Sequence, residues 1–435
     1  MRFRLSSEIT IRSSESTVRT DIPFFLYFVL MYPFYVYTYV QLGLQLALIG
    51  YVLFVRMKKW HGEIPGNVTR NILRLTAWFG LFMAVAMLST TWAVYVKEGS
   101  STLLTLFRIY AIGVTMYLYM DDYYTVLSVI RSLVMAMLVL GVVIFLRTPL
   151  SAYGNAGSDG FGRVIHMHRN TVGAIFAFLA PLCYVKGKTI GLRFSRLAAV
   201  FCAVVVVCTG SRTAIIQLPL FAFFELMISK TDAEKVRKIM YICAAGVLFL
   251  FASRYIPYLK TMVWNRLDSI YQTLIGSGKN YDSSANSRFQ YIKLGWIMFK
   301  TKPLLGYGVD GFYVMTGKIK ELDGETLRQL YSHCNYAEIG SCFGLLGLAV
   351  WYIPVLKILK TSFEWRHKSD MMKFVCASWL TFLVMDWGRI PWEMHHTMYL
   401  LFLMNALYYA EIDQLKRFYG NNSPGASVRK IRFEL

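Results

Sequence analysis

The sequence predicts an all-α polytopic membrane protein with about twelve transmembrane helices and a large, partly helical extracytoplasmic loop. Of the 435 residues, 56% are hydrophobic and only 16% are charged. The mean hydropathy is +0.44, and this balance excludes an ordinary soluble enzyme. Apolar stretches of about 20 residues, long enough to cross a bilayer as helices, recur along the chain. One long polar segment interrupts them before the last three stretches.

The apolar stretches give the expected order of spans. The predicted spans are 22–38, 40–56, 72–95, 101–119, 124–146, 170–186, 194–210, 212–229, 236–254, 336–358, 371–388 and 394–411. Pro33 marks either a kink or a turn between the first two. The chain therefore divides into nine spans (1–254), the large loop (255–335), three further spans (336–411) and a basic tail (412–435).

The distribution of positive charge predicts the orientation. A net charge of +21 suggests nucleic acid in a soluble protein, but here 28 of the 46 Lys and Arg fall in the segments on one side of the membrane. The short segments on the other side hold six, and the long loop is set aside because long loops translocate regardless of charge. Both termini are therefore expected in the cytoplasm. The segments expected outside are 147–169, 209–213, 255–335 and 387–393.

The large loop is about 81 residues long, which is too long for a simple connector. Within 286–300, apolar residues recur at helical spacing and basic residues border them. The stripe consists of Phe289, Ile292, Trp296 and Phe299. Two interpretations remain open: a helix at the membrane surface with its basic edges toward lipid phosphates, or a helix packed on the bundle with solvated charges.

An arginine stands where two spans meet with almost no loop, in CTGSRTAII. Arg212 must lie at or near membrane depth, which is costly unless it faces a partner or a wet cavity. Its guanidinium matches phosphate oxygens in a bidentate way, so an anionic lipid headgroup is a suitable partner. Ser211 offers a hydroxyl in the same turn. The alternative is a turn arginine that extends to the interface.

The segment GRVIHMHRN precedes another span. His166 and His168 have no Cys or carboxylate cluster beside them, so a metal site is not expected there. Arg169 and Asn170 fall at a helix start, where backbone NH groups favour anions. The alternative for these two residues is an interfacial anchor and a helix cap.

The segment SHCNYAEIG opens the span after the large loop. His333 can titrate near neutral pH, as a general base must, although a single histidine at a helix mouth is often only an interfacial residue. No DxD pair occurs in the external segments, and the adjacent Asp121 and Asp122 are expected in the cytoplasm. The seven cysteines form no CxxC pair and are interpreted as free thiols. We therefore expect no metal and no cofactor.

These motifs together resemble the O-antigen ligase and polymerase superfamily, over roughly residues 165–350. The pattern is a GSR turn between spans, then an R…W…PLLGYG segment in a long outer loop, then H-x-N-Y and GLLG. Members are bacterial inner-membrane glycosyltransferases that use undecaprenyl-diphosphate-linked glycans. The resemblance implies that Arg212 and Arg288, with Arg169 as a weaker addition, bind the donor diphosphate. It implies that His333 activates the acceptor hydroxyl.

The chain departs from the family pattern at two places. Cys334 separates His333 from Asn335, and Cys342 stands where an acidic residue often precedes the GLLG run, so that Glu338 is the nearest carboxylate. The supporting roles of Asn335 and Glu338 are therefore open.

The resemblance implies a metal-independent, inverting transfer of a glycan to a sugar hydroxyl. The expected partners are the lipid-linked donor, a lipid-linked or other glycan acceptor and membrane lipid, with no nucleic acid. A polymerase of O-antigen, capsule or exopolysaccharide is preferred. A ligase that moves the finished glycan to lipid A-core or another acceptor is the first alternative. A lipid-linked oligosaccharide flippase is an alternative of another class, although transporters usually show repeat symmetry.

Overall fold

The computed structural model describes residues 18–34, 36–93, 96–149, 160–228, 283–319, 321–322, 325–326 and 328–420, with a few single residues between 240 and 260. The predicted all-helical architecture is confirmed over these residues, apart from a two-residue ladder between β1 (Glu321–Leu322) and β2 (Glu325–Thr326). The helices of the first half are α1 (Ile22–Met31), α2 (Thr38–Trp60), α3 (Gly66–Leu75), α4 (Leu81–Leu88), α5 (Val96–Tyr119), α6 (Tyr123–Arg147), α7 (Arg169–Lys186), α8 (Ser195–Thr209) and α9 (Arg212–Met227). Those of the second half are α13 (Ser283–Thr301), α14 (Gly311–Lys318), α15 (Asn335–Trp365), α16 (Asp370–Met385) and α17 (His395–Tyr419).

Among the described residues, five helices are long and apolar enough to cross a membrane. They are Thr38–Trp60, Gly66–Thr91, Gly99–Tyr119, Tyr123–Arg147 and Asn335–Trp365. The expected count of about twelve is not confirmed. For example, α1 has only 10 residues, which rise about 15 Å against a hydrocarbon core of about 30 Å. The expected span 236–254 lies outside the described residues.

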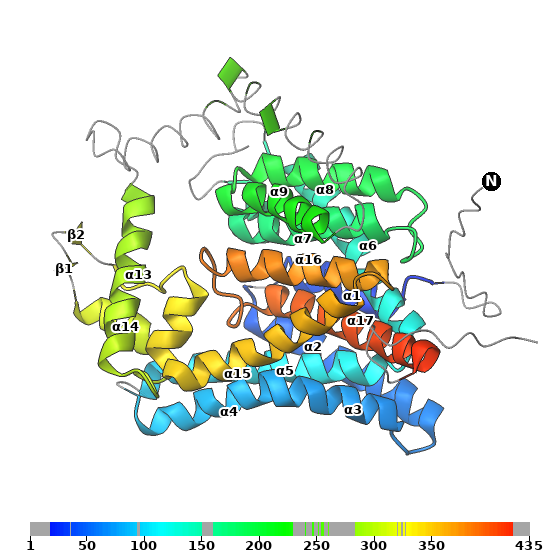
Figure 1. Cartoon of the computed structure of the whole chain (residues 1–435), viewed down its shortest axis with the longest axis horizontal. Coiled ribbons are helices and arrows are strands. Elements are labelled where there is room, and N and C mark those ends of the chain that lie inside the picture. Colours follow the sequence, from blue (N-terminus) through cyan, green and yellow to red (C-terminus); the bar gives the residue numbers. More distant parts are fainter. Residues whose placement is uncertain are drawn as a thin grey trace, which may run out of the picture.

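The long helices lie side by side, and α13 runs across their ends (Figure 1). In that view α7, α8 and α9 form one group, which α16 joins to the rest of the bundle. Gly173 of α7 lets the backbone turn between α8 and α9 approach closely, because a Cβ there would lie 2.7 Å from the Cβ of Ala214. The turn that carries Arg212 is therefore packed directly against the first half of α7.

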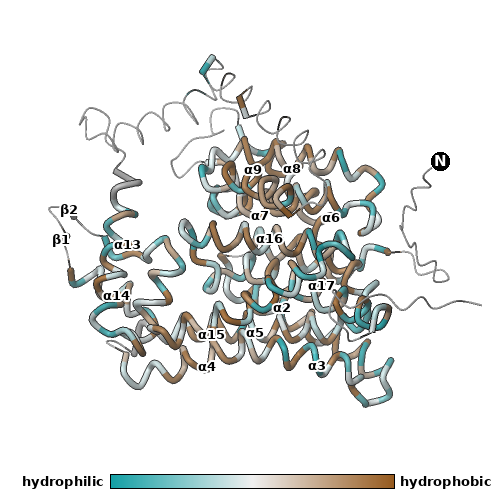
Figure 2. Tube along the Cα trace, in the orientation of Figure 1, coloured by the Kyte–Doolittle hydropathy of each residue, from teal (hydrophilic) through white to brown (hydrophobic). Residues whose placement is uncertain are grey.

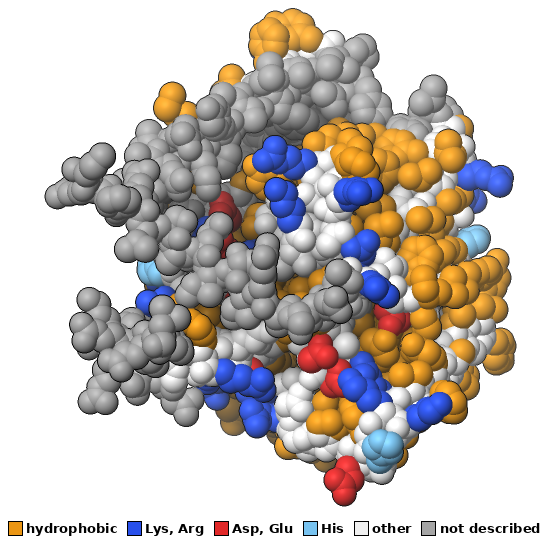
Figure 3. Space-filling view, turned by 90° about the vertical axis from the view of Figure 1, so that its right-hand side faces the viewer, with side chains coloured by type: hydrophobic (Ala, Val, Ile, Leu, Met, Phe, Trp, Pro, Cys, Tyr) orange, Lys and Arg blue, Asp and Glu red, His pale blue; other side chains and the backbone are white. Residues whose placement is uncertain are grey.

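The two ends of the bundle differ in polarity from its middle. Brown, hydrophobic stretches run along the helices and teal, hydrophilic residues recur at their ends (Figure 2). Viewed from the end opposite α13 and α14, Lys and Arg side chains are spread over the face and hydrophobic side chains gather along one edge (Figure 3). This end carries the loops that the sequence assigns to the cytoplasm.

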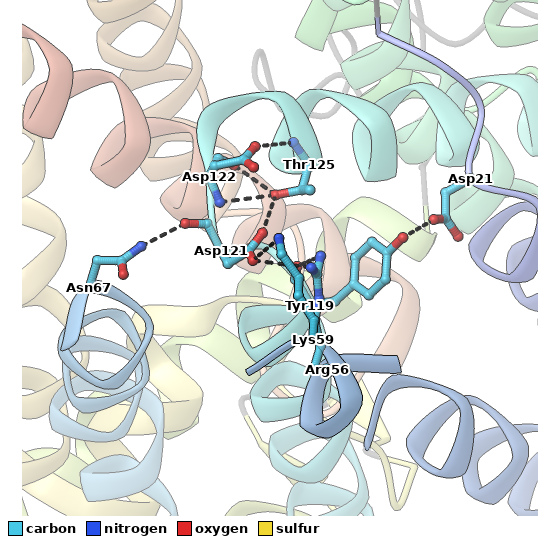
Figure 4. A network of polar contacts seen from close by, with 8 residues as sticks. All are labelled: Asp21, Arg56, Lys59, Asn67, Tyr119, Asp121, Asp122 and Thr125. Atoms are coloured by element: carbon cyan, nitrogen blue, oxygen red, sulfur yellow. Dashed lines mark hydrogen bonds and ion pairs between the residues drawn. The ribbon is translucent and has the colours of Figure 1, made fainter. Parts of the chain in front are cut away.

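The adjacent aspartates form a structural network at that end (Figure 4). The Asp121 carboxylate lies 3.1 Å from Arg56 Nη1 and 2.6 Å from Lys59 Nζ, both on α2. The Asp122 carboxylate caps α6 by accepting the backbone NH of Thr125 at 2.8 Å. The Asp121 carboxylate therefore joins α2 to the start of α6, and the Asp122 carboxylate caps α6.

The motifs PLLGYG and SCFGLLG bind each other through their backbones. Gly344 interrupts α15 with φ 62° and ψ −154°, a conformation that only glycine adopts readily. The break frees backbone groups: Leu345 N donates to the carbonyl of Pro303 at 2.7 Å, and Tyr307 N donates to that of Ser341 at 2.9 Å. A Cβ on Gly344 would lie 2.4 Å from the facing backbone, so no larger residue fits.

Helix α13 is docked on the bundle, while part of its apolar stripe is exposed. Phe289 and Trp296 of the stripe are 66% and 56% exposed. A different face, formed by Tyr291, Leu294 and Met298, is buried, and the helix packs against α15. The sequence stripe therefore marks the outward face of a helix that is docked on the bundle through other residues.

Candidate active site

A cavity of about 320 Å³ lies at the end of the bundle where α7, α9, α15 and α17 begin. Its wall is formed by all four segments that the sequence places outside the membrane, together with the adjoining helix turns. The lining residues are His166, Met167, His168, Asn170, Thr171, Ala174, Thr213, Gln217, Arg288, Tyr331, His333, Met385, Gly388, Arg389, Ile390, Met394, His396 and Thr397. Residues as far apart in the chain as His166 and Thr397 thus share one wall.

The lining is cationic. It holds two arginines and four histidines, and none of the lining residues is Asp or Glu. Threonine, glutamine, asparagine and tyrosine side chains supply further polar groups, and methionines and an isoleucine supply apolar surface. A cavity of this composition favours an anion with several oxygen acceptors.

The predicted base, His333, lines this cavity from a tight loop just before α15. Its φ of 59° is left-handed, which is uncommon for a residue other than glycine. The preceding residue is fixed because Ser332 N donates to Glu338 Oε2 at 2.7 Å. The imidazole ring lies 4.3 Å from the ring of Tyr331, centroid to centroid. The loop geometry therefore holds the side chain against the cavity wall.

The surroundings of His333 favour its neutral form. Loss of water around the ring, followed by the positive charge of Arg288 and by repulsion from the protonated form of His168, lowers the pKa of His333 from 6.5 to about 4. The pKa of His168 is also lowered, by burial and by Arg169 and Arg288. At neutral pH both imidazoles are uncharged, so His333 has a lone pair available to accept a proton.

The predicted arginine of the large loop, Arg288, reaches the same cavity from α13. Gly295 of this helix packs tightly on Ala337 in the first turn of α15. A Cβ added at position 295 would lie only 2.8 Å from the Cβ of Ala337. Tyr291 OH also accepts the backbone NH of Arg328 at 3.2 Å. These contacts fix α13 beside the loop that carries His333.

The other predicted anion-binding residues stand at helix starts around the cavity. Asn170 lines it, whereas Arg169, Arg212 and Ser211 do not. Arg212 is the first residue of α9, after Gly210 with its φ of 58°. Ser211 Oγ lies 3.2 Å from Oγ1 of the lining residue Thr213. Arg212 and Arg169 are therefore immediate chain neighbours of cavity residues.

The two residues whose roles the sequence left open lie behind the wall. Asn335 N donates to the Asp386 carbonyl at 2.7 Å, and Asn335 Nδ2 donates to Asp386 Oδ2 at 3.1 Å. Asn335 thereby joins the start of α15 to the end of α16. Glu338 is 2% exposed and accepts from Ser332. Both residues position the loops that line the cavity.

The lining residues that the sequence did not predict include four with large polar side chains: Arg389, Gln217, Tyr331 and His396. Arg389 could have been predicted, because it stands in a short external segment between two spans. The same position made Arg212 a candidate. Gln217 and His396 lie within expected spans and have no distinguishing pattern in one sequence. Tyr331 became notable only through its contact with His333.

No group of three or more His, Cys, Asp or Glu side chains in the described part of the chain is arranged to hold a metal ion.

Comparison with known families gives one match. Residues 197–352 match the family model described as O-antigen ligase. The match includes Arg212, Arg288 and His333, and ends before Arg389. No curated protein matches the chain. The family points to a membrane glycosyltransferase that acts on lipid-linked glycans. Over residues 197–352 the chain is therefore similar to the O-antigen ligase family.

Proposed function

We propose that the protein is a polysaccharide polymerase. It transfers a glycan from an undecaprenyl-diphosphate donor to a sugar hydroxyl of a lipid-linked acceptor. The observation that carries this proposal is the shared cavity of Arg288 and His333, whose lining residues include no carboxylate. A diphosphate leaving group gains negative charge in the transition state, and fixed arginines stabilise it there.

In the proposed step, His333 accepts the proton of the acceptor hydroxyl. The hydroxyl oxygen attacks the anomeric carbon from the face opposite the leaving group, the bond from carbon to phosphate oxygen breaks, and undecaprenyl diphosphate leaves. The anomeric centre is inverted. Arg288 binds the diphosphate, with Arg212 and Arg169 contributing from the adjacent helix starts, and Asn170 and Ser211 adding polar contacts. No residue in this scheme requires a metal.

Binding of the donor strengthens the base. The positive charge of Arg288 is one cause of the low pKa of His333. A diphosphate bound to Arg288 neutralises that charge and adds negative charge nearby, which raises the pKa of the imidazole. The proton affinity of His333 is therefore highest when the donor is in place.

We further propose that the cavity opens to the extracytoplasmic side of a bacterial inner membrane, with both termini in the cytoplasm and about twelve spans in all. The proposal is supported by the common location of the four segments expected outside the membrane, all of which contribute to one cavity.

The test is glycan elongation in membranes supplied with lipid-linked repeat units. Wild-type protein produces a ladder of products without any other acceptor. The His333→Ala variant elongates at least about 100-fold more slowly, because general base catalysis typically contributes that much or more. Arg417→Gln, an exposed substitution at the far end of α17, is the matched control and keeps the wild-type rate. Excess chelator leaves the rate unchanged.

The family description favours one alternative, an O-antigen ligase. In that case no ladder forms, and a core acceptor receives the preformed glycan in a His333-dependent way. A flippase gives a third result: elongation by a separate enzyme survives His333→Ala while lipid-linked units accumulate on the cytoplasmic leaflet. Strong inhibition by chelator contradicts the metal-independent scheme.

A further inference from the structure

Arg389 is a second arginine of the cavity wall, and it comes from an element that the family match does not reach. It stands in the loop between α16 and α17, whereas Arg288 comes from α13. Its guanidinium lies 4.6 Å from the centroid of the Phe382 ring, which holds the planar group in one orientation. Burial lowers the pKa of Arg389 to about 10, so the side chain is still a cation at neutral pH.

The guanidinium uses only part of its donor capacity within the described residues. Nη1 donates to Gln217 Oε1 at 3.2 Å. Nε and Nη2 are buried and have no hydrogen-bond partner among the residues that the structure describes. Burying N–H donors of a cation without acceptors costs free energy. A ligand in the cavity with anionic oxygens would accept these hydrogen bonds and offset that cost.

The neighbouring carboxylate is engaged elsewhere. Asp386 raises the pKa of Arg389 against the effect of burial, but its Oδ2 accepts from Asn335 Nδ2 at 3.1 Å and from Tyr352 OH at 3.0 Å. Asp386 therefore keeps the loop in place and supports the positive charge of Arg389 from behind.

The two cavity arginines differ in their neighbours. The charge of Arg288 lowers the pKa of His333. In the proposed reaction, the bond between the anomeric carbon and the phosphate oxygen lies beside this histidine. Arg389 instead contacts Gln217, five residues into α9. At 1.5 Å per residue, that contact lies about 7.5 Å along α9 from Arg212 at the helix start. The sequence predicts that α9 enters the membrane from Arg212, so this contact lies on the side of the cavity where the prenyl chain of a lipid-linked substrate continues.

We propose that Arg389, held by Gln217, binds the phosphate that is attached to the prenyl chain. This rests on the proposed function. Arg288 binds the phosphate that carries the sugar, beside His333. The pair aligns the diphosphate along the cavity and places the scissile bond at the base.

The test measures binding of geranylgeranyl monophosphate and geranylgeranyl diphosphate to the purified full-length protein in nanodiscs. Arg389→Gln weakens both ligands by about 10- to 100-fold, the range for one charge-assisted contact. Arg288→Gln weakens the diphosphate more than the monophosphate. Arg389→Lys retains part of the affinity, because it keeps the charge but loses the fork. Arg417→Gln is the control.

Gln217→Glu separates ligand binding from a structural role. The new carboxylate is nearly isosteric and pairs with Nη1 of Arg389, which maintains the loop and neutralises its charge. We expect affinity for both ligands to fall as in Arg389→Gln. Wild-type affinity in Gln217→Glu, or in Arg389→Gln, overturns the proposal, and so does a loss limited to the diphosphate. If wild-type protein binds neither prenyl ligand, the proposed function itself fails.

Discussion

At the residue scale, the proposed chemistry depends on one imidazole whose properties come from its surroundings. A histidine at a helix mouth is ordinary by itself. Here the left-handed loop, the Ser332 to Glu338 hydrogen bond and the nearby guanidinium of Arg288 fix the ring and keep it neutral. These contacts give a common residue type the fixed position and the neutral form that a base for a hydroxyl group needs.

We expect His333 to titrate at a pH of about 4 in the ligand-free protein. In Arg288→Gln the midpoint rises by on the order of one pH unit, because the nearby positive charge of Arg288 is removed while burial remains. Histidine NMR on the isotope-labelled protein measures both values, and the resonance is assigned by its loss in His333→Gln.

The sign of the accompanying stability change follows from the lowered pKa. The unfolded chain binds the proton at the ordinary value of 6.5 and the folded protein only at about 4. His333 therefore reduces the free energy of unfolding as the pH falls from 6.5 to 4. A His333 midpoint near 6.5 in wild-type protein, unchanged in Arg288→Gln, contradicts this description of the site.

At the element scale, the break in α15 organises the site. Because Gly344 leaves the helical conformation, the preceding turns of α15 accept the PLLGYG segment, and that segment follows directly on α13. The same helix begins at Asn335, two residues after His333. One interrupted helix thus connects the loop of the base with the helix that carries Arg288.

Gly344→Ala is expected to destabilise the protein by about 2–4 kcal/mol, from backbone strain and the clash of the added Cβ with the facing backbone. The midpoint of thermal unfolding in detergent should fall by about 5 °C. Gly43→Ala in α2 is the matched control, because a Cβ there meets nothing within 4 Å. Equal midpoints for the two variants would show that the glycine break is dispensable.

At the scale of the whole molecule, the two ends of the bundle carry different sets of polar groups. One end carries the cavity with its arginines and histidines. The other carries the Arg56, Lys59 and Asp121 network and the basic loops. Positive charge retains loops in the cytoplasm, so this asymmetry supports the proposed placement of the cavity on the opposite side, where lipid-linked glycans are joined in the proposed function.

Reporter fusions test this orientation. Alkaline phosphatase fused after residue 160 or 330 should be active, because it folds only outside the cytoplasm. Fusions after residue 190 or 420 should be inactive, and fluorescent protein fusions should give the reverse pattern. The fusion after 330 also tests the expected span 236–254. Phosphatase activity at 190 or 420 would invert the proposed topology.

The extent to which the sequence anticipated the site differs between residues. His333, Arg288 and Asn170 were predicted and line the cavity, because each belongs to a polar motif at a span boundary. Gln217 and His396 were missed, since a polar residue inside an apolar stretch gives no sign of the direction in which it points. Arg389 was missed although its short external segment resembled that of Arg212.

The sequence by itself determined the membrane class, the helical architecture, the positions of most helices and the polar motifs, because hydropathy, helix length and loop charge are local properties. Only the tertiary structure decided which of those motifs meet. It brought Arg389 and Gln217 to the cavity, placed Asn335 and Glu338 behind its wall, and buried the face of α13 opposite its apolar stripe. The physical reason is that these outcomes depend on packing between helices far apart in the chain, and in particular on the backbone contact that a single glycine permits at residue 344.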